Sequence, residues 1–171
     1  MKEKNLQKIL WIFLLSMCFI SCSDSDGGKP SENELYANFV GSWNFSGEVK
    51  FDDTTTEIQG VIEYYKDKMF KATNILYRDG ELYLKEELSG TCFIIRYEDS
   101  YELNIVNDDS DKSNLIFKDL RFGYNGIYQC QKEHSILKTS FSKDLTTITF
   151  YRLYEYAGSR QEVIVTLKRN N

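Results

Sequence analysis

Apolar and polar residues alternate along most of this chain, in short segments that turn residues separate. In the first segment, every second residue is apolar or small: Trp43, Phe45, Gly47, Val49 and Phe51. A period of two puts alternate side chains on opposite faces of a strand. We therefore predict a strand whose aromatic and aliphatic face is directed toward a core.

The same alternation predicts strands through the rest of the chain, with Ile58 to Tyr64 and Tyr101 to Ile105 as clear further examples. Asp79-Gly80 is a two-residue hairpin signal, and Gly90 is expected to separate two strands. The segments indicate eight to eleven strands, and we expect eight to ten in the sheet. They span residues 43–51, 58–64, 69–77, 81–87, 91–98, 101–107, 115–120, 127–131, 135–141, 145–156 and 161–168.

Short turns join these segments, so neighbouring strands must run antiparallel. A meander of this length has to close or stack to protect its edges, which favours an up-and-down barrel or a β-sandwich. Ser31 and Glu34 form a capping-box pattern that predicts a short N-terminal helix ending at Phe39. We predict an all-β, antiparallel up-and-down barrel with this short helix.

Composition supports this fold class and limits the partners. Twelve Tyr, eleven Phe and a single Pro are typical of β-structure. Residues 1–21 carry three lysines and one glutamate, so the other 150 residues hold 18 basic and 25 acidic side chains. A net charge of −7 argues against nucleic acid and anionic lipid as electrostatic partners.

The N-terminal segment is typical of a signal peptide. Lys2, Lys4 and Lys8 precede an apolar run from residue 9 to residue 20. A run of about twelve residues suits a signal sequence and is too short to span a bilayer as a helix. After residue 21, the chain is rich in Ser, Asp and Gly, as in a flexible tether.

Phe19-Ile20-Ser21-Cys22 resembles a bacterial lipobox. The resemblance implies that Cys22 is lipidated and that the chain is an outer-membrane lipoprotein, periplasmic or exposed on the cell surface. An ordinary secretory signal is the alternative. The Ser-Asp-Ser-Asp stretch after Cys22 resembles the acidic export signal of some lipoproteins that are displayed on the cell surface. The alternative is that it is only part of the linker. We predict a signal peptide over residues 1–21, a tether over 22–34 and one barrel domain over 35–171.

Phe39 to Phe45 contains Gly41-Ser42-Trp43, which resembles the Gly-x-Trp opening strand of the calycin group of lipocalins, fatty-acid-binding proteins and avidins. The chain is most similar to short lipocalin-like lipoproteins of Gram-negative bacteria. The resemblance implies that Trp43 plugs one end of a barrel and that a basic residue, Lys168 or Arg169, packs over it. The chain ends at the last strand, without the C-terminal helix of true lipocalins.

Arg152 shares a strand face with apolar neighbours, and a charge there is costly unless it is paired. Arg152-Leu153-Tyr154 resembles the Arg-x-Tyr pair with which fatty-acid-binding proteins hold a carboxylate. Arg96 is a second candidate for an inward-facing ligand residue. The alternative is that Arg152 faces outward and meets Glu162 across the strands.

Cys92 and Cys130 are the cysteines left in the predicted domain. An oxidising compartment would allow them to form a disulfide, whose loop of about 39 residues would contribute about 4 kcal/mol. Two buried free thiols are the alternative, because cysteine often packs as a small apolar residue.

The sequence shows no catalytic constellation. His134 is the only histidine, and no nucleophile motif lies near it. Glutamates such as Glu63, Glu86, Glu98 and Glu102 lie on predicted strands without a defined pairing. The loop 107–114 matches a calcium loop only in part. We expect no enzyme activity, no cofactor and no metal.

These observations predict a membrane-anchored lipoprotein that binds a small apolar or amphipathic ligand in the barrel mouth. A surface module that binds a protein or glycan through exposed aromatic residues is the alternative, and a secreted hydrolase ranks third. An open interior would favour the first, and an exposed aromatic patch would favour the second.

Overall fold

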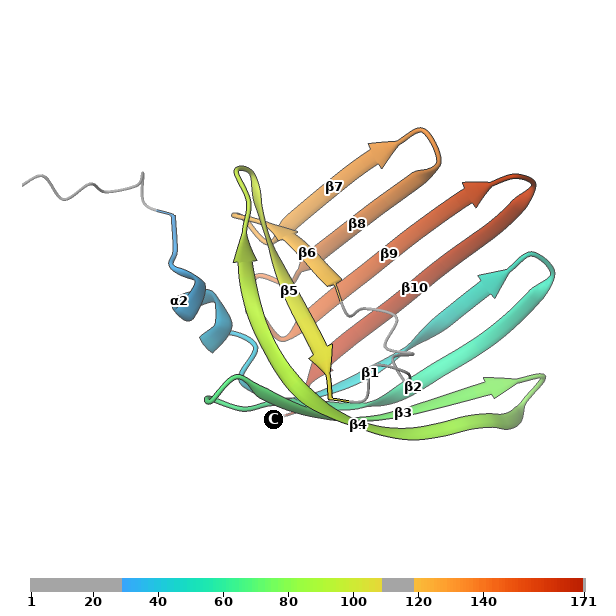
Figure 1. Ribbon diagram of the computed structural model, residues 1–171, viewed down its shortest axis with the longest axis horizontal. Helices are drawn as coiled ribbons and strands as arrows, with labels where there is room; N and C mark the ends of the chain where they lie inside the picture. Colours follow the sequence, from blue (N-terminus) through green and yellow to red (C-terminus); the bar gives the residue numbers. More distant parts are fainter. Residues whose placement is uncertain (1–28, 109–118, 171) are drawn as a thin grey trace, which may run out of the picture.

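The computed structural model describes residues 29–108 and 119–170, which form one short helix and one antiparallel sheet (Figure 1). The predicted signal peptide, Cys22 and the loop at 109–118 lie outside the described residues. The elements are α2 (Glu32–Ala37), β1 (Gly41–Phe51), β2 (Thr54–Tyr64), β3 (Met69–Arg78), β4 (Glu81–Arg96), β5 (Ser100–Asn107), β6 (Asp119–Gly123), β7 (Ile127–Lys132), β8 (Ser135–Phe141), β9 (Thr147–Tyr156) and β10 (Ser159–Arg169).

The ten strands lie in the order β6-β5-β4-β3-β2-β1-β10-β9-β8-β7. Strands that follow each other in the chain are therefore neighbours, except for β6 and β7, and β10 also pairs with β1. The two edges, β6 and β7, are joined by a short turn in which Gly126 N donates to Gly123 O at 2.9 Å. Arg121 Nη1 also reaches the Tyr128 hydroxyl across this seam, at 3.3 Å. The predicted all-β, up-and-down barrel is confirmed, and its architecture fits a calycin-like barrel.

The inner face follows the predicted alternation. Trp43 and Phe45 on β1 and Ile58 and Ile62 on β2 are all at most 2% exposed. Inner residues of adjacent strands lie opposite each other, as Phe45 of β1 does with Leu167 of β10. The period-two pattern thus identified which side chains enter the core.

Strand β4 differs from the prediction of two strands separated at Gly90. It runs unbroken from Glu81 to Arg96 and curves around the barrel (Figure 1). A Cβ at Gly90 would lie 2.0 Å from the Val106 carbonyl oxygen and 3.0 Å from Cε1 of Phe70. Gly90 therefore permits a close approach of strands within the sheet, as glycine can inside a strand, and does not mark a chain reversal.

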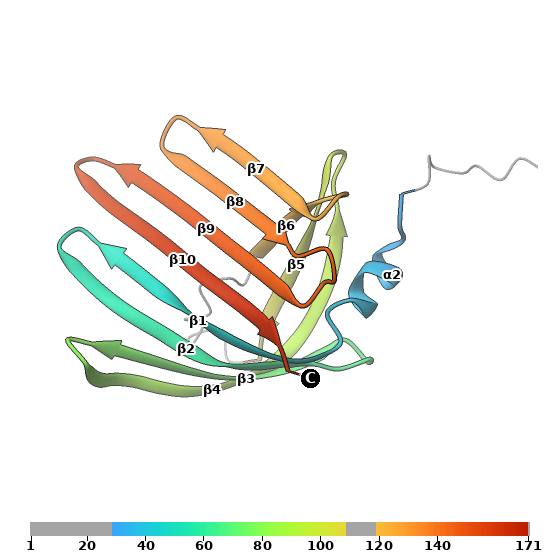
Figure 2. The ribbon, with the colours of Figure 1, turned by 180° about the vertical axis from the view of Figure 1, so that it is seen from behind.

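Helix α2 covers one end of the barrel (Figures 1 and 2). Its predicted capping box is confirmed, because the Ser31 hydroxyl accepts from Glu34 N while the Glu34 carboxylate accepts from Ser31 N at 2.8 Å. Tyr36 and Phe39 enter the core beneath it. Among described residues, no helix is long and apolar enough to cross a membrane.

Inner-face side chains are buried at the end of the barrel under α2 and become more exposed toward the opposite end. We call these the closed end and the open end. At the closed end, under α2, aromatic rings pack with centroids 5.0–6.0 Å apart. At the open end, where the β1–β2, β3–β4, β7–β8 and β9–β10 turns lie, inner-face residues such as Phe51 are half-exposed. The core is therefore concentrated in the closed half. Its rings belong to Phe39, Tyr64, Tyr101, Phe122 and Phe141.

Candidate functional site

The open end carries a candidate binding surface on the inner face of β1, β10, β9 and β8. Cross-strand register aligns Val49, Val163, Arg152 and Leu137 in one row. The next row outward holds Phe51, Gln161 and Tyr154. We call these two rows the mouth face.

Arg152 lies on this face with Phe150, which is 2% exposed, and opposite Val163, which is fully buried. The alternative contact with Glu162 is not formed. Glu162 pairs with Leu153 on the other face, and its carboxylate lies 3.8 Å from Arg160. Among the residues that the structure describes, none forms an ion pair or hydrogen bond with the Arg152 side chain. The N–H donors of the Arg152 guanidinium are therefore available to a bound ligand.

Tyr154 lies one row nearer the solvent than Arg152 and is 46% exposed. Its ring stacks on Tyr156, with centroids 6.5 Å apart, and Tyr156 in turn meets the edge of His134 at 5.8 Å. The three rings line the β8–β9 side of the mouth. Tyr154 is thus placed where its hydroxyl can meet a ligand that reaches Arg152.

Arg96 lies elsewhere. It occupies the last position of β4, where it pairs with Tyr101 at the closed end. Arg152 pairs with Val163 in the open half, so the fold does not bring the two arginines to one site. Strand alternation in the sequence predicted that both arginines face inward. It could not predict how far along the barrel axis each of them lies.

Sequence reasoning missed a partly buried pair of polar side chains on the opposite wall. Asn74, which is fully buried, donates to the Glu86 carboxylate at 2.8 Å across β3 and β4. Arg78 lies over the Tyr83 ring at 4.3 Å near the tip of the same hairpin. The strand alternation could have shown this. Asn74 lies two residues after Ala72 and four after Phe70, so it faces inward as they do.

The residues taken from the calycin resemblance lie together at the closed end. Trp43 is 1% exposed, and its Nε1 donates to Phe39 O at 2.7 Å. The Arg169 guanidinium lies 4.7 Å from the indole and donates to the Asn38 carbonyl. Gly41 has a φ of 124°, which a residue with a side chain rarely adopts. These residues fix Trp43 in place at the closed end of the barrel, and they offer no binding surface.

Of the two alternatives for Cys92 and Cys130, the disulfide is not formed, and both thiols are free. Cys92 lies under α2, where its Sγ is 3.1 Å from the Tyr36 hydroxyl and 3.4 Å from Lys68 O. Cys130 lies on the edge strand β7. Burial raises the pKa of the Cys92 thiol, so it stays protonated and packs as a core residue.

The catalytic candidates remain scattered. His134 lies in the exposed β7–β8 turn, with its Nε2 3.9 Å from Glu133. Glu102 faces outward to Arg121 at 3.5 Å, whereas Glu86 faces inward. Within the described part of the chain, no group of three or more His, Cys, Asp or Glu could hold a metal ion.

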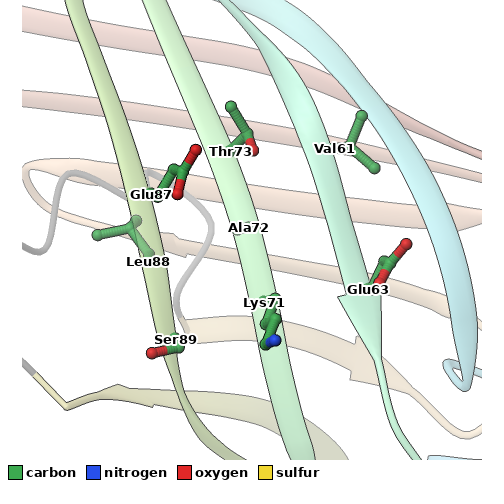
Figure 3. A pocket seen from close by; sticks show the side chains of 8 residues that line it. All are labelled: Val61, Glu63, Lys71, Ala72, Thr73, Glu87, Leu88 and Ser89. Atoms are coloured by element: carbon green, nitrogen blue, oxygen red, sulfur yellow. The ribbon is translucent and has the colours of Figure 1, made fainter.

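The outer face of the sheet is hollowed, which the sequence analysis did not predict. Three hollows of about 590, 400 and 490 Å³ adjoin across β10, β1, β2, β3 and β4. The first and second share Val61, and the second and third share Ser46 and Gln59. Figure 3 shows the first hollow, which is lined by Val61, Glu63, Lys71, Ala72, Thr73, Glu87, Leu88 and Ser89.

No family model and no curated protein matches the chain. Among solved structures, the S-type phycobiliprotein lyase CPES from Guillardia theta aligns with a TM-score of 0.47 and 11% identity, over 84% of this chain and 95% of that one. A de novo designed fluorescence-activating β-barrel aligns with a TM-score of 0.37 and 12% identity, over 82% of this chain and 100% of that one.

The expectation that this chain is not an enzyme is corrected by the first of these matches. A protein named as a lyase aligns over most of this chain. At 11% identity, the match assigns no activity to the residues described here.

Proposed function

We propose that this protein is an extracytoplasmic lipoprotein, anchored through Cys22, that binds a small amphipathic anion at the mouth face. The observation that carries the proposal is the placement of Arg152. Arg152 is half-buried, like Val49 and Leu137 in the same inner row, and its guanidinium has no partner among described residues.

The chemistry of this row suits a ligand with two parts. The planar guanidinium can donate two parallel hydrogen bonds to a carboxylate. Val49 and Leu137 on the same row offer apolar contact for an aliphatic body. Tyr154 can add a hydroxyl donor from the next row. A charge that is costly to bury alone becomes favourable when a carboxylate completes it.

Palmitate titration against wild type and Arg152→Leu tests the proposal. Loss of one charge-assisted hydrogen bond should weaken palmitate binding by about 1.5–3 kcal/mol. Palmitamide, which lacks the charge, should bind both proteins alike. Arg160→Leu is the matched control, because Arg160 is exposed beside Glu155 and Glu162 on the outer face.

Two results would contradict the proposal. The first is absence of palmitate binding to the wild type. The second is equal loss of palmitate affinity in Arg152→Leu and Arg160→Leu, since that would trace the effect to net charge and not to the mouth face.

The anchor has a separate test, because it depends only on the lipobox resemblance at Cys22. Cys22→Ser should release the protein from membranes and abolish labelling by a fatty-acid probe. A protein that remains in the membrane fraction after this substitution would argue for an uncleaved signal or another mode of attachment.

A further inference from the structure

The hollows on the outer face form one continuous surface, which we call the outer trough. They join through shared lining residues, Val61 in one case and Ser46 and Gln59 in the other. The trough crosses the sheet on the side opposite the core. Hydroxyl, amide, carboxylate and amine side chains line it, together with apolar residues such as Val61.

Two tyrosines form hydrogen bonds with side chains that line the trough. Tyr65 follows β2, is 36% exposed, and donates its hydroxyl to Glu63 at 2.5 Å. Tyr77 lines the third hollow, and its hydroxyl accepts from Gln59 Nε2 at 3.3 Å. The distance along β2 from Gln59 to Tyr65 is about 20 Å for an extended strand. Both rings are thus held by residues that themselves line the trough.

The backbone beneath the trough is already paired, which restricts the class of ligand. β1, β2 and β3 each have a neighbour on both sides. An extended peptide therefore finds no free N–H or C=O groups with which to join the sheet here. Recognition has to come from side chains, which here are hydroxyls, amides, carboxylates and amines.

Charge restricts the ligand further. The lining has four carboxylates and two amines, so it disfavours a polyanion such as nucleic acid or a sulfated polymer. The acidic side chains are Glu48, Glu57, Glu63 and Glu87, and the basic ones are Lys71 and Lys168.

We propose that the outer trough binds a neutral oligosaccharide. Carboxylates, amides and hydroxyls can exchange hydrogen bonds with sugar hydroxyls without requiring a net charge. The ring faces of Tyr65 and Tyr77 carry partial negative charge, so they can pack against the C–H face of a sugar ring. Val61 supplies an apolar patch between them. The site is separate from the mouth face, because outward and inward side chains alternate along the same strands.

Affinity gel electrophoresis of the full chain tests this proposal with four neutral polysaccharides: amylopectin, mixed-linkage β-glucan, xylan and galactomannan. Wild type should be retarded by at least one of them and not by heparin. Tyr65→Ala should weaken that retardation about tenfold, the value expected for loss of one aromatic contact of about 1.4 kcal/mol. Val61→Arg should abolish it by filling the centre of the trough.

Three controls separate recognition from folding and from the mouth face. Tyr65→Phe should retain most of the binding, because it keeps the ring. Phe93→Ala, on the outer face of β4 but outside the trough, should have no effect. Arg152→Leu should also leave retardation unchanged. Thermal midpoints near that of wild type would show that the variants fold.

The proposal is overturned if none of the four polysaccharides retards the wild type. It is also overturned if heparin retards it equally, or if folded Val61→Arg and Tyr65→Ala bind like wild type. None of these results depends on palmitate binding, so failure here is distinct from failure of the proposed function.

Discussion

The two ends of the barrel are built from the same strands, yet they differ in almost every physical property. Phe70, on the inner face at the closed end, is fully buried, whereas Phe51, on the inner face at the open end, is 53% exposed. Both follow the same alternation of inner and outer positions. Strand pattern alone therefore does not determine burial, and the cap formed by α2 and its aromatic neighbours does.

Hydrogen bonding differs in the same direction. At the closed end, the Tyr36 hydroxyl donates to Tyr65 O at 2.8 Å, and the Tyr101 hydroxyl donates to Pro30 O at 2.7 Å. Buried donors require such partners. At the open end, the Arg152 side chain has no partner among described residues. The Tyr36 and Tyr101 hydroxyls thus stabilise the closed end, whereas the Arg152 guanidinium remains available to a ligand.

The greatest loss of stability is expected from a substitution at the closed end. Trp43→Ala removes a fully packed indole, its hydrogen bond to Phe39 O and the contact with Arg169. It should lower the free energy of unfolding by roughly 3–5 kcal/mol. Chemical denaturation followed by far-UV circular dichroism measures this loss. A loss below about 1 kcal/mol would mean that the plug does not carry the stability assigned to it.

A second prediction concerns the curvature that lets β4 contribute to both ends. Gly90→Ala should cost roughly 1–3 kcal/mol, because the new methyl group would overlap the Val106 carbonyl and force the strands apart. Thr91→Ala is the adjacent control, since Thr91 is exposed on the outer face. Equal denaturation midpoints for the two variants would refute the close approach at Gly90.

Substitution of an aromatic residue at the open end should be tolerated best. Phe51→Ala should change the free energy of unfolding by no more than about 0.5 kcal/mol, as for an ordinary surface substitution. Phe70→Ala, the same substitution at the closed end, should cost roughly 3–5 kcal/mol. Paired thermal denaturation curves compare them directly. Similar losses would remove the distinction between the ends.

Most strands, their faces and the helix start could be predicted from the sequence. Alternation identified the inner residues of β1 and β2, the Asp79-Gly80 signal identified a hairpin, and Ser31 with Glu34 identified the start of α2. These features depend on neighbours only a few residues apart. Local sterics, turn chemistry and capping are encoded in a short stretch of chain, so one sequence is enough to predict them.

The arrangement of distant segments became visible only in the folded chain. There, Gly90 continues a strand, Cys92 and Cys130 stay apart, and Arg96 and Arg152 lie toward different ends. The outer trough also emerges only there, because its residues come from five strands. The register of each strand pair and the coiling of the sheet set these distances, and both arise from packing between segments far apart in the chain.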